Sequence, residues 1–190
     1  MSNERELFIP VILGTTREGR MSAHVARFVH REMEQRQGVE TELIDIADVP
    51  MPIDGAGDAI KDPAFSERMN RADAIVIVAP EYNHSFPGLL KHVLDTCLEE
   101  YIHKAAGIVG VSAGSFGGAR VIQNTLPVLR ELGLMAIFTD VYVGNVHKAF
   151  DESGRLLEPA FIKRVDNFLD ELVWMATTLR YGREHIAVSG

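Results

Sequence analysis

The run Ala74–Ala79 constrains the fold of this chain more than any other feature of its sequence. It reads Ala-Ile-Val-Ile-Val-Ala, so no position along it is polar. A strand of this kind needs apolar cover on both faces, which strands in the middle of a parallel sheet receive from helices above and below. The sequence therefore predicts a buried central strand in an α/β protein.

Further apolar runs alternate with segments of helical periodicity along the chain. The other strands are expected at Leu7–Leu13, Glu40–Ile46, Ala106–Ser112 and Leu134–Val143. Helices are expected at Ser22–Gln37, Asp62–Ala72, Gly88–Glu100 and Gly118–Leu132, and from Glu158 to about Tyr181. The segment Asp48–Ala64, rich in Pro, Gly and Asp, is expected to be a surface loop. Five β/α units predict a doubly wound parallel sheet in a single domain over residues 1–190.

The composition of the chain argues against several classes of binding partner. The formal net charge of the 190 residues is −8, and an overall negative field repels nucleic acids and anionic membranes. The single cysteine, Cys97, excludes an internal disulfide framework and is expected on a buried helix face. The apolar run Leu7–Leu13 is too short for a membrane span or a secretion signal. We therefore expect a cytoplasmic protein with no nucleic-acid or membrane partner.

A ligand is expected at the loops after Leu13, Ala79 and Ser112, because open α/β sheets bind ligands at the carboxyl ends of their strands. The first of these loops, Gly14–Ser22, reads Gly-Thr-Thr-Arg-Glu-Gly-Arg-Met-Ser and leads into a helix. Hydroxyls, guanidinium groups and the unpaired N–H groups of a helix start all suit a phosphate. The alternative is that the arginines of this loop are solvated charges and its hydroxyls only cap the helix.

Two familiar nucleotide-binding motifs are incomplete in this loop. Gly14 and Gly19 have the spacing of a P-loop, but Arg20 and Met21 stand where Lys and Ser/Thr are required. Thr16 occupies the second glycine position of the dinucleotide fingerprint. Nucleoside triphosphate hydrolysis and a Rossmann dehydrogenase are therefore not expected.

The second loop, Pro80–Gly88, has the residues that a planar heteroaromatic ligand needs. Its prolines restrict the backbone, so Tyr82 and Asn83 can be presented in a fixed geometry as an apolar wall and an amide contact. An ordinary strand-to-helix turn, with Asn83 or Ser85 as the N-cap, explains the same composition.

The third loop, Ser112–Gly118, is made mostly of small residues. Its glycines allow the backbone to approach a flat ligand closely, and equally they suit a tight turn. Seven histidines and one cysteine form no recognised metal-binding pattern, so no metal is expected.

The first two loops together carry a resemblance to a known family. The segments G-T-T-R-E-G-R at 14–20 and P-E-Y-N-H-S-F-P-G-L-L-K at 80–91 resemble those of the NADPH-dependent FMN reductase family. This family of flavodoxin-like proteins includes small quinone, azo-dye and chromate reductases. The resemblance implies a flavodoxin-like three-layer α/β sandwich with a five-stranded parallel sheet in the order 2-1-3-4-5.

The resemblance also implies a cofactor and its contacts. FMN would bind with its phosphate on Thr15, Arg17, Arg20, Met21 and Ser22, and with Pro80, Glu81, Tyr82 and Asn83 lining its isoalloxazine. Ser112 and Gly114 lie in the region that borders the flavin in the family. No catalytic side chain is implied, because FMN itself carries the chemistry.

The expected activity is hydride and electron transfer from NADPH or NADH through FMN to a small-molecule acceptor. Quinones, azo compounds, chromate and free flavin are the expected acceptors, used in a ping-pong cycle. A flavodoxin-type electron carrier without direct NAD(P)H oxidation is the main alternative, and a phosphate- or nucleotide-binding regulatory module is a third. Apolar residues around the helices at 88–100 and 118–132 indicate either core packing or a subunit interface, and a homodimer or homotetramer is expected.

Overall fold

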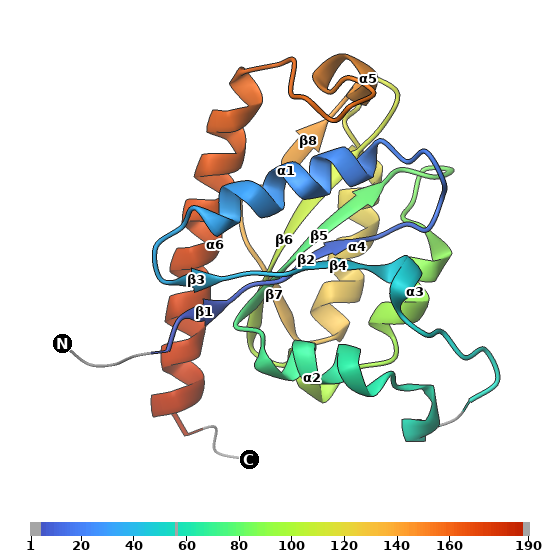
Figure 1. The fold of residues 1–190 in the computed structure, drawn as a ribbon. Coiled ribbons are helices and arrows are strands. Elements are labelled where there is room, and N and C mark those ends of the chain that lie inside the picture. Colours follow the sequence, from blue (N-terminus) through green and yellow to red (C-terminus); the bar gives the residue numbers. More distant parts are fainter. Residues whose placement is uncertain (1–4, 56, 188–190) are drawn as a thin grey trace.

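The computed structural model describes residues 5–55 and 57–187 and contains a parallel sheet covered by helices on both faces (Figure 1). The strands are β1 (Leu7–Phe8), β2 (Val11–Leu13), β3 (Val39–Glu40), β4 (Leu43–Asp45), β5 (Ala74–Pro80), β6 (Lys104–Val111), β7 (Leu134–Ala136) and β8 (Val141–Val143). The helices are α1 (Ser22–Glu34), α2 (Pro63–Arg71), α3 (Gly88–Leu94), α4 (Ala119–Glu131), α5 (Val146–Ala149) and α6 (Ala160–His185). Short 3-10 turns lie at η1 (Ile46–Asp48), η2 (Gly57–Ile60) and η3 (Glu99–Tyr101).

The main sheet has six strands rather than the predicted five. Its order is β4-β2-β5-β6-β7, with β8 also paired to β6, and β1 and β3 form a separate parallel pair. Three predicted strands are each divided into two pieces, and the order agrees with 2-1-3-4-5 when the pieces are taken together. The prediction of a flavodoxin-like α/β sandwich is thus confirmed, and only its strand count is wrong.

Pro10 is the reason for the first division, because it has no N–H group for a ladder hydrogen bond. The backbone pairing continues on both sides of it. Ile9 N donates to Glu40 O at 2.9 Å, and Val76 N donates to the carbonyl of Pro10 at 2.9 Å. A strand that lacks one donor therefore still holds its place beside β5.

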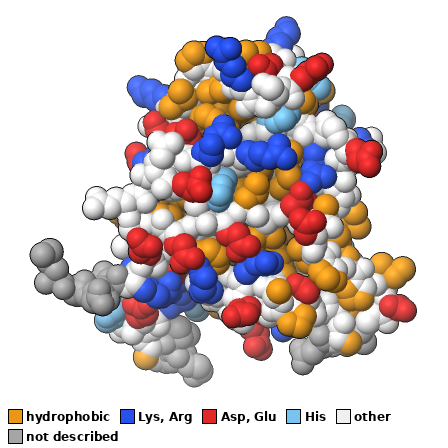
Figure 2. Space-filling view, viewed as in Figure 1, with side chains coloured by type: hydrophobic (Ala, Val, Ile, Leu, Met, Phe, Trp, Pro, Cys, Tyr) orange, Lys and Arg blue, Asp and Glu red, His pale blue; other side chains and the backbone are white. Residues whose placement is uncertain are grey.

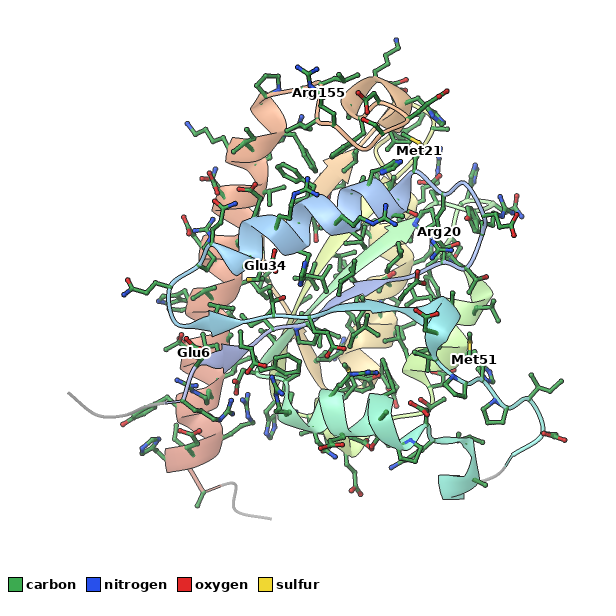
Figure 3. All side chains as sticks on the ribbon, viewed as in Figure 1. Glu6, Arg20, Met21, Glu34, Met51 and Arg155 are labelled. Carbon is green, nitrogen blue, oxygen red and sulfur yellow. The ribbon has the colours of Figure 1, made fainter. Side chains whose placement is uncertain are left out.

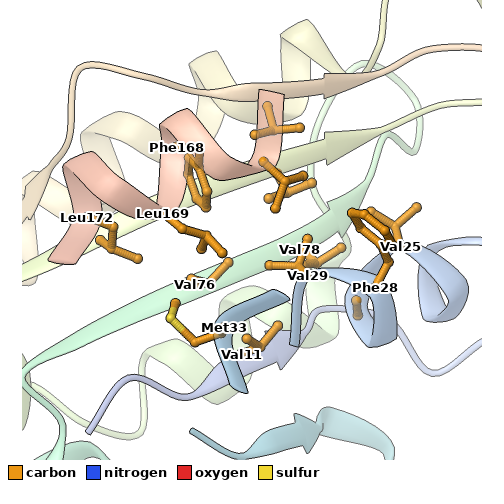
Figure 4. Close-up of a cluster of buried hydrophobic side chains, with 14 of the residues drawn as sticks. Val11, Val25, Phe28, Val29, Met33, Val76, Val78, Phe168, Leu169 and Leu172 are labelled. Carbon is orange, nitrogen blue, oxygen red and sulfur yellow. The ribbon is translucent and has the colours of Figure 1, made fainter. Parts of the chain in front are cut away.

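The central strand β5 has apolar cover on both faces, as predicted. Ala74, Val76 and Val78 pack into a core with α1 and α6, whereas Ile75, Ile77 and Ala79 pack into another with α2, α3 and α4. Figure 4 shows side chains of α1 and α6 meeting over β5 in the first of these cores. The two cores hold the strands in one register, so their carboxyl ends form a common edge.

Several helix predictions need correction. Helix α3 ends at Leu94 instead of residue 100, and α6 continues to His185. The helix α5 and the 3-10 turns were not predicted, and η2 lies inside the expected loop 48–64. Within the described residues no helix is long and apolar enough to cross a membrane.

The side chain of Cys97 lies in the core, as expected, with only 2% of its surface exposed, but it follows the end of α3 and is not on a helix face. Burial, with a smaller contribution from the charge of Glu100, raises the pKa of the Cys97 thiol to about 11. A thiol with such a pKa carries little thiolate at neutral pH, which argues against a reactive thiol at Cys97.

Candidate functional site

A cavity of about 400 Å³ lies at the carboxyl-end edge of the sheet. The loops that follow β2, β5, β6 and β8 contribute its walls. The lining residues are Arg17, Glu18, Gly19, Arg20, Met21, Ser22, Pro80, Glu81, Tyr82, Val111, Ser112, Ala113, Val146 and His147. The structure thus brings the three predicted loops to one place.

Eight of the eleven residues singled out in the sequence line this cavity: Arg17, Arg20, Met21, Ser22, Pro80, Glu81, Tyr82 and Ser112. Thr15, Asn83 and Gly114 do not line it. The side chain of Thr15 is buried beneath the first loop, whereas Asn83 and Gly114 are exposed.

The start of α1 presents two buried polar atoms without a hydrogen-bond partner among the described residues, Arg20 Nε and Ser22 Oγ. Both residues line the cavity, and Figure 3 shows Arg20 and Met21 in the loop that leads into α1. The rest of the Arg20 guanidinium is held in place, since Nη1 donates to Arg17 O at 3.0 Å and Nη2 pairs with Asp45 at the end of β4. Buried donors without partners are costly, and an anionic oxygen would satisfy them.

The capping alternative for this loop is wrong. The N-cap of α1 is Met21, and its side chain makes no capping hydrogen bond. The Thr15 hydroxyl instead lies 2.9 Å from Tyr82 Oη, where either group can donate. Neither Thr15 nor Ser22 therefore caps the N-terminus of α1.

Tyr82 connects the first loop to the second. In addition to its contact with Thr15, its ring lies 4.0 Å from the guanidinium carbon of Arg17, a cation–π arrangement. Its backbone exchanges hydrogen bonds with Ser85 at 2.9 and 3.0 Å, which closes a tight turn. Asn83 and His84 lie in that turn with φ of 50° and 67°. This turn directs Tyr82 toward the cavity.

The second loop is also not a simple capping turn, because the N-cap of α3 is Pro87, whose side chain makes no capping hydrogen bond.

Glu81 is held in place by two contacts. Its backbone N–H donates to Val111 O at 2.8 Å, and its carboxylate pairs with Arg120 of α4 at 3.0 Å. The wall of the cavity formed by Pro80, Glu81 and Tyr82 is consequently well supported.

Sequence reasoning missed the contribution of the loop after β8. Val146 and His147 line the cavity from the start of α5. Asn145, with φ of 47°, turns the chain there, and its N–H donates to Gly114 O at 2.8 Å. The rule that selected the other three loops also applies to a loop after Val143, so the signal was present.

Together the fold and the cavity define a class. The protein is a flavodoxin-like α/β protein in which the arginine-containing loop before α1 lines a cavity that has an aromatic wall. The model of the family described as NADPH-dependent FMN reductase matches residues 8–148, and the chain belongs to this family.

Relatives agree with this assignment. The chain is 31% identical over 151 residues to an NAD(P)H-dependent FMN reductase of Pseudomonas aeruginosa, covering 75% of this chain and 82% of the relative. It is 29% identical over 165 residues to a quinone reductase of Escherichia coli K12, covering 80% and 86%. The structure of the flavoenzyme NAD(P)H:(acceptor) oxidoreductase FerB of Paracoccus denitrificans superposes with a TM-score of 0.74 at 22% identity, covering 89% and 98%.

The family prediction is thereby confirmed. The protein is an oxidoreductase with FMN as its cofactor and NAD(P)H as its electron donor. Membership in an enzyme family favours this interpretation over an electron carrier or a regulatory module.

Proposed function

We propose that FMN occupies the cavity at the carboxyl-end edge, within a single FMN-binding domain of residues 1–190. The proposed contacts of the FMN phosphate are Thr15, Arg17, Arg20, Met21 and Ser22. The proposed contacts of the isoalloxazine ring are Pro80, Glu81, Tyr82 and Asn83. Ser112 and Gly114 are proposed to border the ring. The observation that carries the proposal is a pair of buried donors in the wall of this cavity, Arg20 Nε and Ser22 Oγ, that have no partner in the described part of the chain.

Thr15 has a double role in this proposal. A hydroxyl group can accept one hydrogen bond while donating another. Thr15 Oγ1 can therefore accept from Tyr82, 2.9 Å away, and donate its own proton toward the phosphate. Thr15 would then hold the ring of Tyr82 in place and bind the phosphate at the same time.

The proposed reaction reduces small molecules at the expense of NADPH or NADH. When bound, FMN supplies the redox chemistry, accepting hydride from the nicotinamide and passing electrons to an acceptor that then takes the nicotinamide's place, in a ping-pong sequence. The residues of the chain bind and orient the participants and exclude water. Quinones, azo compounds, chromate and free flavin are the proposed acceptors, and the quinone reductase among the relatives supports the first of these.

Initial rates test this proposal. NADPH is varied at several fixed concentrations of a soluble quinone, with the FMN-loaded protein. Parallel double-reciprocal lines are expected, because the two substrates would never occupy the site together. Intersecting lines would show a ternary complex and contradict the shared site.

We also propose that the protein is a cytoplasmic homodimer or homotetramer. Most apolar residues of α3 and α4 belong to the core, but Leu89 of α3 is 45% exposed and Phe116 before α4 is 66% exposed. In the proposed assembly these two side chains would be buried between subunits. Light scattering at micromolar concentration is expected to give a multiple of the 21.0 kDa chain, and a mass of one chain would contradict it.

A further inference from the structure

The loop Arg17–Met21, which holds three of the proposed phosphate contacts of FMN, also lines a second cavity of about 390 Å³. The other walls of this cavity come from α1, through Ala23, His24 and Arg27, and from Glu152 in the turn before α6. The two cavities adjoin, because the same loop forms part of both. Ser22 lines only the first of them, and Arg27 only the second.

The second cavity is rich in guanidinium groups. Arg17, Arg20 and Arg27 all line it, together with His24. Among the described residues neither Arg17 nor Arg27 forms an ion pair, and the Arg17 guanidinium lies over the Tyr82 ring. Figure 2 shows basic side chains over α1 on this face of a chain whose net charge is −8. Arg20 is paired with Asp45, so Arg17 and Arg27 supply the unpaired positive charge that attracts a small anion.

One wall of this cavity is preformed. In the turn before α6, Asp151 Oδ1 accepts from Ser153 N at 2.9 Å and from Arg155 N at 2.9 Å. Gly154 has φ of +82°, and a Cβ added there would lie 2.5 Å from His24 Nδ1. Only glycine allows the turn to come this close to His24.

We infer that this second cavity binds the 2′-phosphate of NADPH and makes the enzyme prefer NADPH to NADH. The 2′-phosphate is a monoester dianion on the adenosine ribose, and NADH lacks it. Arginine is the side chain best suited to such a group. The inference rests on the proposed function, because the nicotinamide of the same molecule must reach the adjoining FMN cavity.

Two carboxylates in the same cavity would repel a bound phosphate, and they allow a second test of the inference. Glu18 and Glu152 also line the cavity, and Glu152 is exposed. Removing the charge of Glu152 would relieve repulsion of a phosphate, whereas removing Arg27 would weaken attraction. The two changes should thus shift affinity for the phosphorylated nucleotide in opposite directions.

Calorimetric titration of the FMN-loaded protein with NADP⁺ and NAD⁺ tests the inference without turnover. The expected result is that NADP⁺ binds about tenfold more tightly than NAD⁺. Arg27→Ala should weaken NADP⁺ binding about fivefold and leave NAD⁺ within about twofold, and Glu152→Gln should strengthen NADP⁺ binding about twofold. Equal losses for both nucleotides in Arg27→Ala, or no loss for either, would overturn the inference.

Arg31→Ala is the matched control. Arg31 lies one turn further along α1, is exposed, and forms no ion pair among the described residues, but does not line the cavity. It should leave both affinities unchanged. FMN affinity, measured on the apoprotein by flavin fluorescence, should be equal in wild type and Arg27→Ala; a fall would assign this cavity to the FMN phosphate and overturn the inference. Selectivity for NADP⁺ in a protein that takes up no FMN would support the inference and contradict the proposed function.

Discussion

At the start of α1, Ser22 keeps a buried hydroxyl without a hydrogen-bond partner among the described residues. If this group serves the FMN phosphate, Ser22→Ala should weaken FMN binding about tenfold, the effect of one hydrogen bond to a charged group. Riboflavin lacks the phosphate, so its affinity should not change. Fluorescence titration of the apoprotein with each flavin measures both.

The control for this prediction is Ser115→Ala, which removes an exposed hydroxyl outside the cavity and should leave both flavins unaffected. Equal weakening of FMN and riboflavin by Ser22→Ala would mean that the hydroxyl supports the loop and does not bind phosphate.

Gly107 in β6 faces Phe168 of α6 so closely that a Cβ there would lie 2.4 Å from the ring. Gly107→Ala should therefore lower the free energy of unfolding by about 2 kcal/mol through overpacking. Gly182 in α6 is a contrasting case, because a Cβ there meets nothing within 4 Å. Gly182→Ala should raise stability by about 0.5 kcal/mol, since alanine favours a helix. Urea unfolding compares the two, and a stable Gly107→Ala protein would contradict the packing described here.

At the scale of elements, the buried carboxylate of Glu100 in η3 joins three segments. It accepts hydrogen bonds from Ser66 Oγ in α2 at 2.7 Å, from Lys61 Nζ at 3.0 Å and from Leu98 N at 3.0 Å. Burial alone raises the pKa of Glu100, but these hydrogen bonds outweigh it and lower the pKa from 4.5 to about 2. The folded state thus favours the ionised form.

Glu100 should make the free energy of unfolding depend on pH in the acidic range. Because its pKa is lower in the folded than in the unfolded chain, its contribution is complete above pH 4.5 and is lost as the pH falls toward 2. Glu100→Gln should cost on the order of 2 kcal/mol at pH 7 and flatten this part of the pH profile. Urea unfolding from pH 7 to pH 2.5 measures it, with the exposed neighbour Glu99→Gln as control. Parallel profiles for wild type and Glu100→Gln would refute the role given to these hydrogen bonds.

At the scale of the whole molecule, the sequence predicts the architecture well because burial on both faces leaves a clear pattern. The apolar run at 74–79 identified the central strand, and the loops that precede α1 and α3 line the cavity. Divided strands were not predicted, since a single residue such as Pro10 interrupts a ladder without disturbing the apolar pattern. Nor could residue order reveal that Thr15 contacts Tyr82 or that Arg20 pairs with Asp45, because these contacts arise only when distant loops meet.

The loop after β8 shows a different reason why part of the site was not predicted from the sequence. His147 lines the cavity, although the short helix that carries it is only four residues long. A helix of one turn has too few residues to show periodicity, so its place at the carboxyl-end edge is the only sequence signal for it.

The central claim is that the cavity holds FMN and that NAD(P)H reduces it there. The most direct test is to add NADPH to the purified, FMN-loaded protein without oxygen and to record the visible flavin absorbance by stopped flow. We predict prompt bleaching, followed by recovery of the absorbance when a quinone is added. A protein that takes up FMN but whose absorbance stays unchanged with NADPH and with NADH would contradict the account.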